Sequence, residues 1–459
     1  MNIMERTIAA ISTALGVGGI AVIRISGNRA LEIADKVFFG KDKLSEAQTH
    51  TVHYGFIKNA DGVKVDEVLA TVMLAPKTFT REDVVEISTH GGVTTSKEVL
   101  DTIIKAGAYM AMPGEFTKRA FLNGRIDLSQ AEAVIDIINA KNELSQRNAL
   151  SQLEGALSGE IAEVRDKLVY LAAQMQVTID YPDEDLEDIT IDDIRRISDE
   201  CRKKVDTLLK TADSGKILRD GIKTAIVGKP NVGKSSLLNS LARAERAIVT
   251  DIAGTTRDII EEYINLNGIP LILVDTAGIR KTEDVVEKIG VEKSKRSIED
   301  ADLVIVMLDG SDILDDEDRE VLAQTHHKNR IILINKSDLG ESKYTAAVKA
   351  KAGKSPVLEV SAKTGIGLDK LAELIRDIYS LGELAAGDSA IVTNMRHKSA
   401  LADASEALTR VVEGIDIGMP SDIVSIDINM AINSLGEITG ETVSDDIVNK
   451  IFHEFCVGK

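Results

Sequence analysis

The chain has 459 residues, which is enough for roughly two to four domains of ordinary size. Hydrophobic residues make up 44% and charged residues 28% of the sequence, the balance of a globular protein with a core. No apolar run reaches the length of about 18 residues that a membrane-spanning helix needs. The net charge of −19 disfavours a general nucleic-acid-binding protein, although a local basic face or a partner can still supply the positive field that phosphates require.

The N-terminus and the cysteines indicate a cytosolic protein. The first residues, Met1 to Arg6, lack the basic start and apolar stretch of a signal peptide. The two cysteines, Cys201 and Cys456, lie far apart and form no metal-ligand spacing. Both are therefore expected to be reduced thiols.

The first 118 residues predict an α+β domain. Short apolar runs typical of strands occur at residues 20–25 and 68–74, with helical stretches between them. From about residue 129 to residue 180 the apolar spacing is helical, and Pro182 ends that helix before an acidic loop at residues 183–188. A second helix is expected at about residues 191–210.

From Gly221 onward the pattern changes to strands that alternate with helices. This alternation predicts a mainly parallel, doubly wound sheet. The expected strands are residues 224–227, 271–274, 303–308, 331–334 and 357–360. Helical spacing then returns at residues 398–413, 422–435 and 444–455.

Two helical stretches therefore flank the α/β segment, and neither is expected to bury its apolar face alone. We infer one helical domain into which the α/β domain is inserted. The expected domains are residues 1–118, a first helical part at 119–215, the α/β domain at 216–380, and a second helical part at 381–459.

A phosphate-binding loop begins the α/β domain. Residues 228–235 read GKPNVGKS, between an expected strand and an expected helix, and they match the pattern G-x-x-x-x-G-K-[ST]. In this pattern backbone N–H groups wrap the phosphates, Lys234 reaches the β and γ phosphates, and the Ser235 hydroxyl ligates magnesium. The N-terminus of the following helix favours the same anion.

A second motif predicts that the base is guanine. Asn335, Lys336 and Asp338 follow an expected strand in the order N-K-x-D. The Asp338 carboxylate can accept both N–H donors of guanine, which adenine lacks, and the Lys336 stem stacks beneath the base. Ser361, Ala362 and Lys363 support the O6 side of the base from the next loop.

The γ-phosphate is expected to meet two further loops. Asp275 ends a strand, where a magnesium-linked carboxylate belongs, and Gly278 can bond the γ-phosphate. Thr255 or Thr256 can close on magnesium from the polar loop at residues 250–256. The water-orienting Gln that follows this glycine in Ras is replaced by Ile279. Another group must position the water, and Arg257 is open as either an internal arginine finger or an ordinary surface arginine.

These motifs give the expected nucleotide-binding set. It consists of Asn231, Val232, Gly233, Lys234, Ser235, Ser236, Thr250, Asp251, Ile252, Ala253, Gly254, Thr255, Thr256, Asp275, Thr276, Ala277, Gly278, Asn335, Lys336, Asp338, Ser361, Ala362 and Lys363.

The α/β domain resembles the Era type of GTPase, and the whole chain resembles the MnmE (TrmE) family of tRNA-modification GTPases. The segments that carry the resemblance are residues 24–27 (RISG), 79–86 (FTREDVVE), 90–92 (HGG), 113–117 (PGEFT), 119–125 (RAFLNGR), 251–258 (DIAGTTRD) and 455–459 (FCVGK).

The resemblance implies a function. The family works with a flavin-dependent partner, MnmG, to build an aminomethyl-type group, including carboxymethylaminomethyl, on carbon 5 of the wobble uridine of certain tRNAs. The one-carbon unit comes as a tetrahydrofolate derivative, such as the 5,10-methylene or 5-formyl form. The N-terminal domain binds this folate and forms a homodimer, and the GTPase domains pair in a potassium-dependent way.

The resemblance also implies roles for single residues. Arg24, Glu86, Arg125 and Lys459 match the family's folate contacts, although some members have Lys where this chain has Arg125. Ser235 and Thr256 are implied for Mg²⁺. Glu287 matches a glutamate that helps to orient the attacking water, and so stands with Lys234 and Gly278 as a catalytic residue. The residues implied for K⁺ are Asn231, Thr250, Ile252 and Thr255.

Two other functions stay open on the sequence alone. An Era-like ribosome-assembly GTPase would need an RNA-binding module after the GTPase domain, and the chain after Leu381 shows none. A stand-alone folate-dependent transferase would use GTP only for regulation. No G-x-G-x-x-G segment follows an expected strand, so redox chemistry would have to come from a partner.

Overall fold

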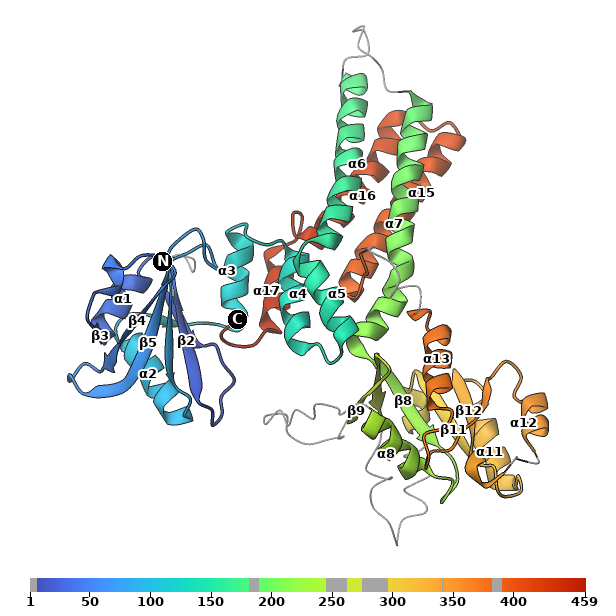
Figure 1. Cartoon of the computed structure of the whole chain (residues 1–459). Helices are drawn as coiled ribbons and strands as arrows, with labels where there is room; N and C mark the ends of the chain where they lie inside the picture. Colours follow the sequence, from blue (N-terminus) through green and yellow to red (C-terminus); the bar gives the residue numbers. More distant parts are fainter. Residues whose placement is uncertain are drawn as a thin grey trace. The chain divides into compact units, whose positions relative to one another are not determined.

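We describe the protein from a computed structural model, which covers residues 6–180, 190–244, 262–274, 296–340, 342, 344–381 and 390–459. The chain divides into two compact units (Figure 1). The first consists of Met1–Ile138, Ser151–Arg202 and Asp403–Lys459, and the second of Asn139–Leu150 and Lys203–Ala402. No helix of the described residues is both long enough and apolar enough to cross a membrane.

The first unit is built on a seven-stranded sheet in the order β3-β4-β5-β6-β2-β1-β7. Neighbouring strands are antiparallel except β1 and β7, which run parallel. The strands are β1 (Ile8–Ile11), β2 (Ile20–Ser26), β3 (Phe38–Gly40), β4 (Thr51–Lys58), β5 (Lys64–Met73), β6 (Val84–His90) and β7 (Tyr109–Met110).

Alternation along the strands gives this sheet two different faces. One face, which we call the core face, is covered by helices α1 (Ala30–Val37) and α2 (Val93–Lys105), and it holds the buried apolar side chains of this domain. We call the opposite face the outer face. There Phe116 of helix α3 (Glu115–Leu122) and Phe79 of a loop pack against Ile8 and Ala10 of β1. The short 3₁₀ helix η2 (Leu44–Glu46) adds Leu44 to the core. This confirms the predicted N-terminal α+β domain.

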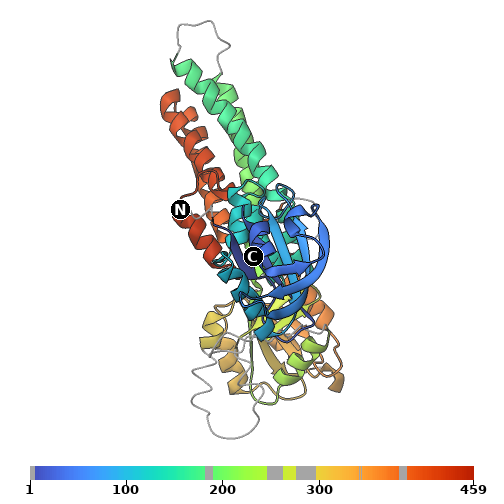
Figure 2. The ribbon, with the colours of Figure 1, turned by 90° about the vertical axis from the view of Figure 1, so that its left-hand side faces the viewer.

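Helices occupy the segments on both sides of the second sheet in sequence. They are α4 (Leu128–Asn139), α5 (Glu143–Leu153), α6 (Ala156–Asp180), α7 (Ile191–Asp220), α15 (Met395–Asp416), α16 (Ser421–Thr439) and α17 (Asp445–His453). Within the first unit, α6 and α16 lie side by side although about 250 residues separate them in the sequence (Figures 1 and 2). The prediction of an all-helical domain is confirmed.

The prediction of one helix from residue 129 to residue 180 is wrong, because this stretch forms three helices. Asn142 caps α5, its Oδ1 accepting the backbone N–H of Ser145 at 2.8 Å. Gly155 interrupts the helix a second time, between α5 and α6, with a φ of +96° that favours glycine. The apolar spacing survives both breaks, so periodicity alone does not show them.

The second unit holds a six-stranded sheet in the order β13-β12-β11-β8-β10-β9. All neighbours are parallel except β9 and β10, so the prediction of a mainly parallel sheet is confirmed. The strands are β8 (Ile222–Val227), β9 (Glu262–Leu266), β10 (Ile269–Leu273), β11 (Leu303–Asp309), β12 (Arg330–Asn335) and β13 (Val357–Glu359).

Helices cover both faces of this sheet, as a doubly wound fold requires. Helices α8 (Lys234–Ala244) and α13 (Leu368–Ile378) bury their leucines in one core. Helices α11 (Asp316–Gln324) and α12 (Thr345–Lys351) contribute to the core on the other face. The short helix η3 (Ser337–Leu339) follows β12. All seven residues of the central strand β11 are buried, which explains its uninterrupted apolar sequence.

Candidate functional sites

The phosphate-binding loop connects β8 to α8 at the carboxyl edge of the parallel sheet, where α/β proteins bind nucleotides. Lys234 is the first residue of α8, and the backbone N–H of Leu237 already bonds the carbonyl of Gly233. Gly233 has a φ of +101°, and a side chain there would collide with Nδ2 of Asn335. The second glycine of the motif is therefore required both by its backbone conformation and by the close approach of the guanine-reading loop.

Asn335 ties the three nucleotide-binding segments together. Its Nδ2 donates to the carbonyl of Val232 at 2.7 Å, and its Oδ1 accepts the backbone N–H of Ala362 at 2.9 Å. Asn335 is almost fully buried, so both bonds are shielded from water and are costly to leave unmade. The loops predicted from residues 228–235, 335–338 and 361–363 are thus brought together at one site.

The base-reading end of the site is arranged by two further contacts. Ser361 Oγ donates to Asp338 Oδ1 at 2.7 Å, which orients the carboxylate and leaves its second oxygen without a partner among the described residues. The Lys336 ammonium donates to Asp309 Oδ2 at 2.5 Å. This contact extends the Lys336 side chain toward Asp309. It also holds Lys336 in its left-handed backbone conformation, with a φ of +67°.

Asp309 was not predicted as a site residue. Burial raises its pKa, but the hydrogen bond from Lys336 and those from Ser311 outweigh that effect, and the pKa is held below its usual value. An acidic residue that ends a buried parallel strand is the sequence signal that would have found it.

The Lys234 ammonium is held by backbone carbonyls of the phosphate loop. It donates to the carbonyls of Gly228 at 2.6 Å and of Lys229 at 2.8 Å. Burial lowers the pKa of Lys234 because the charged form loses hydration. An arriving phosphate anion would restore a favourable partner for this charge, which is the expected role of the residue.

A cluster of acidic residues holds the side chain of Lys229, and the sequence did not predict it. The Lys229 ammonium contacts Asp315 Oδ2 at 2.7 Å and Asp318 Oδ2 at 3.0 Å. These carboxylates form a capping box at the N-terminus of α11, each accepting the other's backbone N–H. The hydrogen bond from Lys229 lowers the pKa of Asp315 to about 2, whereas burial raises the pKa of Asp318. The cluster joins the phosphate loop to α11.

Several predicted residues lie outside the described part of the chain. These are Thr250, Asp251, Ile252, Ala253, Gly254, Thr255, Thr256, Arg257, Asp275, Thr276, Ala277, Gly278, Ile279 and Glu287. Within the described residues, Asn231 and Ser235 are exposed in the phosphate loop, and Asn231 has a φ of +65°.

A second group of predicted residues meets on the outer face of the first sheet. Arg24 of β2 and Glu86 of β6 are cross-strand neighbours, and their ion pair measures 2.8 Å. The guanidinium carbons of Arg24 and Arg125 lie 5.8 and 4.9 Å from the ring centroid of Phe79. Two of the four predicted folate contacts therefore lie against one aromatic ring, and a third, Glu86, is paired with Arg24.

A buried network holds the loop that carries Phe79. Arg119 of α3 is only 1% exposed and pairs with Glu82 at 3.0 Å and with Glu115 at 2.8 Å. Glu82 also accepts the hydroxyl of Ser26 on β2 at 2.7 Å. Sheet, loop and helix are thus linked by charge-assisted hydrogen bonds, which hold the loop that carries Phe79.

The fourth predicted residue, Lys459, arrives from the far end of the sequence. Gly458 is buried against the backbone of Ile11 and Ser12 at the end of β1, where a side chain would overlap the carbonyl oxygen of Ile11. The carbonyl of exposed Cys456 accepts the backbone N–H of Gly114 at 3.3 Å. The tail therefore brings Lys459 to the strand whose Ala10 pairs with Arg24.

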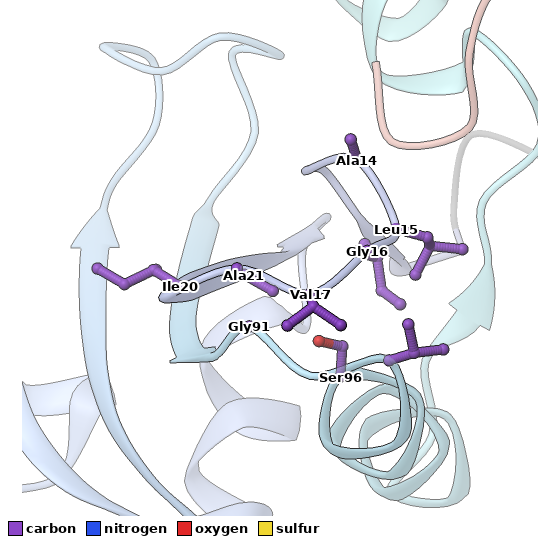
Figure 3. Close-up of a pocket in the computed structure, with 11 residues that line it drawn as sticks. Ala14, Leu15, Gly16, Val17, Ile20, Ala21, Gly91 and Ser96 are labelled. Atoms are coloured by element: carbon purple, nitrogen blue, oxygen red, sulfur yellow. The ribbon is translucent and has the colours of Figure 1, made fainter. Parts of the chain in front are cut away.

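A cavity of about 200 Å³ opens near the same end of the sheet (Figure 3). The glycine-rich loop at residues 14–18 and the start of α2 line it, and Ser96 of α2 lies opposite Val17. The Ser96 hydroxyl already donates to the carbonyl of Gly92 at 2.9 Å. None of the four predicted folate residues, all of which are described, lines this cavity.

The doubly wound sheet, the phosphate loop and the guanine-reading loops define a GTPase of the phosphate-loop class. Comparison with known proteins makes the assignment more specific. The family model described as the MnmE helical domain matches residues 128–456, and the model described as the GTP-binding protein TrmE N-terminus matches residues 7–125. The chain belongs to the MnmE (TrmE) family.

Full-length relatives agree with this assignment. The tRNA modification GTPase MnmE of Acetivibrio thermocellus is 51% identical over 456 residues, and that of Listeria welshimeri is 50% identical over 454 residues; each alignment covers 99% of both chains. A solved structure of Aquifex aeolicus Era bound to GDP and AlF₄⁻ is 31% identical, covering 40% of this chain and 66% of that chain, with a TM-score of 0.28. Its membership of the MnmE (TrmE) family makes this enzyme a GTPase of tRNA modification, and the Era-like alternative is not favoured.

Proposed function

We propose that this chain is a potassium-dependent GTPase that acts in the cytoplasm on certain tRNAs together with the flavin-dependent partner MnmG. The pair installs an aminomethyl-type group, including carboxymethylaminomethyl, on carbon 5 of the wobble uridine, and a tetrahydrofolate derivative supplies the carbon. The observation that carries the folate part is that Arg24 and Arg125 both lie against the ring of Phe79 and that Glu86 pairs with Arg24.

The chemistry of these side chains fits a folate. Glu86, paired with Arg24, offers carboxylate oxygens to the N–H donors of a pterin, while Arg125 offers a cation to the carboxylates of the glutamate end. Lys459 adds a further cation to the site. Phe79 offers an aromatic face to the flat rings between the two ends. When bound, the folate would supply a one-carbon unit, and these residues would orient it.

The experiment compares wobble uridines by mass analysis in tRNA from a strain that lacks this chain. Complementation with the wild-type chain should restore the modified nucleoside, whereas Glu86→Gln should not. Titration of the purified full chain with 5-formyl-tetrahydrofolate should show weaker binding for Glu86→Gln and unchanged affinity for GTP. Normal modification and normal folate affinity in Glu86→Gln would remove folate binding from this site.

For GTP hydrolysis we propose roles for the nucleotide-binding residues. Lys234 contacts the β and γ phosphates, and Ser235 and Thr256 hold Mg²⁺. Gly278 bonds the γ-phosphate, and Glu287 helps to orient the attacking water. Glu287 thereby takes the role of the Gln of Ras, whose position is occupied by Ile279 in this chain. The remaining set of Asp251, Ala253, Gly254, Asp275, Thr276 and Ala277 contacts the nucleotide from its two loops.

We propose that Asn231 helps to hold K⁺, which when bound would supply positive charge to offset the charge that develops on the phosphates in the transition state. Asn231 supports this role because its exposed side chain makes no hydrogen bond to another described residue, so the carboxamide oxygen is available. Thr250, Ile252 and Thr255 complete the expected ligands. A cage of neutral oxygens suits K⁺ better than the smaller Na⁺.

We further propose that the chain is a homodimer through its N-terminal domain and that the dimer assembles with MnmG into a heterotetramer or larger complex. The support is the part of the outer face that Phe79 and Phe116 leave uncovered. Strand register places several apolar side chains on it, each 44–69% exposed. They are Ile20, Phe39, Val52, Tyr54 and Leu69. Contiguous exposed apolar surface of this kind marks protein interfaces.

A further inference from the structure

A second arginine, Arg81, lies at the rim of the candidate folate site in an unfavourable backbone conformation. Its φ is +57°, in the left-handed region that long side chains rarely adopt. Residues held in such conformations cluster at ligand sites, where the surrounding structure over-determines them. The conformation of Arg81 therefore calls for an explanation beyond a surface turn.

The surrounding contacts hold Arg81 on both sides. Its Nη1 donates to the carbonyl of Asn123 at 2.9 Å, and the Asn123 side chain returns a bond to the carbonyl of Thr80 at 2.7 Å. The guanidinium passes over Gly124, where a side chain would come within 3.5 Å of Nη1. Arg81 is thus placed beside the residue that follows Gly124, which is Arg125.

Arg81 and Arg125 form a pair of positive charges without a countercharge. No described carboxylate lies within 4.0 Å of either guanidinium, whereas Arg24 is paired with Glu86. The hydrogen bond of Arg125 also goes to a neutral carbonyl, that of Phe79, at 2.9 Å. Burial and the nearby charge of Arg81 both lower the pKa of Arg125. An anion with two or more negative charges would relieve this repulsion.

The order of these groups matches the shape of an elongated ligand. Glu86 pairs with Arg24 on the sheet, Arg24 and Arg125 both lie against the ring of Phe79, and the exposed Arg81 lies near Arg125. A molecule with a donor-rich ring system at one end and carboxylates at the other would run from the sheet to the exposed arginines.

We propose that Arg81 and Arg125 bind the carboxylates of a poly-γ-glutamyl tail and thereby make the site selective for polyglutamylated folates. The proposal rests on the proposed folate site and adds the tail as the part of the ligand that is recognised at its rim. Arginine suits this task because its planar fork binds carboxylates in two-point contacts.

The test titrates the full chain with 5-formyl-tetrahydrofolate carrying one or three glutamates. The wild type should bind the triglutamate about tenfold more tightly, the value expected for two partly exposed ion pairs. In Arg81→Gln this preference should fall to about threefold, the factor left by the one remaining ion pair, with monoglutamate affinity unchanged. Glutamine keeps an N–H donor for the Asn123 carbonyl. If Arg81 had only a structural role, Arg81→Gln would therefore keep the wild-type preference for the triglutamate. Arg81→Lys should keep part of the preference, because lysine retains the charge but not the two-point contact.

A matched control removes one exposed positive charge from the other face of the same sheet, in Lys97→Gln on α2. It should leave both affinities unchanged. If the wild type binds neither folate, the folate site itself is wrong. If it binds both equally, or if Arg81→Gln keeps the preference, only the tail assignment fails. Loss of tRNA binding in Arg81→Gln with an intact folate preference would instead assign the two arginines to nucleic-acid phosphates.

Discussion

Replacing Lys229 by methionine tests how strongly the phosphate loop is joined to α11. The change keeps most of the side-chain volume but removes the ammonium that pairs with Asp318, whose side chain is only 2% exposed. One oxygen of Asp318 already lacks a hydrogen bond among the described residues. Without Lys229 the carboxylate would be buried with only the backbone N–H of Asp315 as a donor.

Breaking a buried ion pair by removing one partner costs about 3–5 kcal/mol. Asp318 can reduce this cost by taking up a proton, since burial has already raised its pKa. The Asp315 side chain is half exposed. The Asp312 carboxylate lies 3.9 Å from the Lys229 ammonium and is more exposed. Because solvent screens both carboxylates, their ion pairs with Lys229 add little to the stability that is lost. We therefore expect Lys229→Met to weaken the local stability of α11 and the phosphate loop by about 2–4 kcal/mol at neutral pH.

The effect should depend on pH in one direction. An acid whose pKa is raised by folding stabilises the fold less as pH rises, because the folded state binds the proton more tightly than the unfolded state. Removing Lys229 raises the pKa of Asp318 further, so the loss of stability should shrink toward pH 4 and grow toward pH 8. Asp315, held at a pKa of about 2 by Lys229 in the wild type, loses its stabilising shift as well.

Hydrogen–deuterium exchange of the full chain measures this locally. Amides of α11 should exchange about 30- to 800-fold faster in Lys229→Met, the factor that corresponds to 2–4 kcal/mol. Arg319→Met is the matched control, since it breaks an exposed ion pair with Asp316 on the same helix, which should change protection by less than about 0.5 kcal/mol. Lys229→Arg should stay close to wild type. Equal exchange in Lys229→Met and Arg319→Met would refute the reasoning.

Three other predictions concern the nucleotide, the ion and the dimer. Asp338→Asn should lose a few kcal/mol, or roughly a hundredfold or more, of GTP affinity and gain affinity for xanthine nucleotides; unchanged GTP binding by calorimetry would contradict the assignment. Phosphate release should be faster in K⁺ than in Na⁺ at equal ionic strength, and Asn231→Ala should abolish the difference while Lys234 maintains nucleotide binding; equal wild-type rates in the two salts would return Arg257 as the candidate cation. Leu69→Asp should shift the chain from dimer to monomer in sedimentation velocity. The control is Ile313→Asp, at an apolar position in the second unit that is more exposed than Leu69. A monomeric wild type or a dimeric Leu69→Asp would count against the interface.

The sequence predicted the second sheet well because its signal is local. Buried parallel strands are continuous apolar runs, and each predicted strand agrees with the observed one to within two residues at either end. Strand β9 was missed, although Asn267 and Gly268, both with positive φ, form the two-residue hairpin signal that joins it to β10. The dipeptide, read together with the alternation in residues 262–266, would have shown this strand.

The motifs predicted which residues form the nucleotide site, but not what holds them. Lys229 lies 89 positions before Asp318, and Lys336 lies 27 positions after Asp309. No spacing rule links such pairs, because the fold and not the local chain brings them together. The same holds for Phe79, because only the fold shows that Arg24 and Arg125 lie against its ring. The motifs therefore predicted candidate ligand contacts, and the structure added the groups that orient those side chains.

Backbone conformation supplies a separate indication of where ligands bind. In the described chain, six non-glycine residues have positive φ: His50, Arg81, Asn231, Asn267, Lys336 and Ser380. Three of these lie at the proposed sites, and two of the three are long cationic side chains, for which the left-handed region costs about 1–2 kcal/mol. Each cation is held by a specific partner, Lys336 by Asp309 and Arg81 by Asn123. Such a conformation persists when the contacts around it outweigh its cost, and a side chain that is held in place before the ligand arrives loses less entropy on binding. The strain at Lys336 is thus consistent with a preformed guanine site, and by the same reasoning the strain at Arg81 favours a ligand role over an ordinary surface charge.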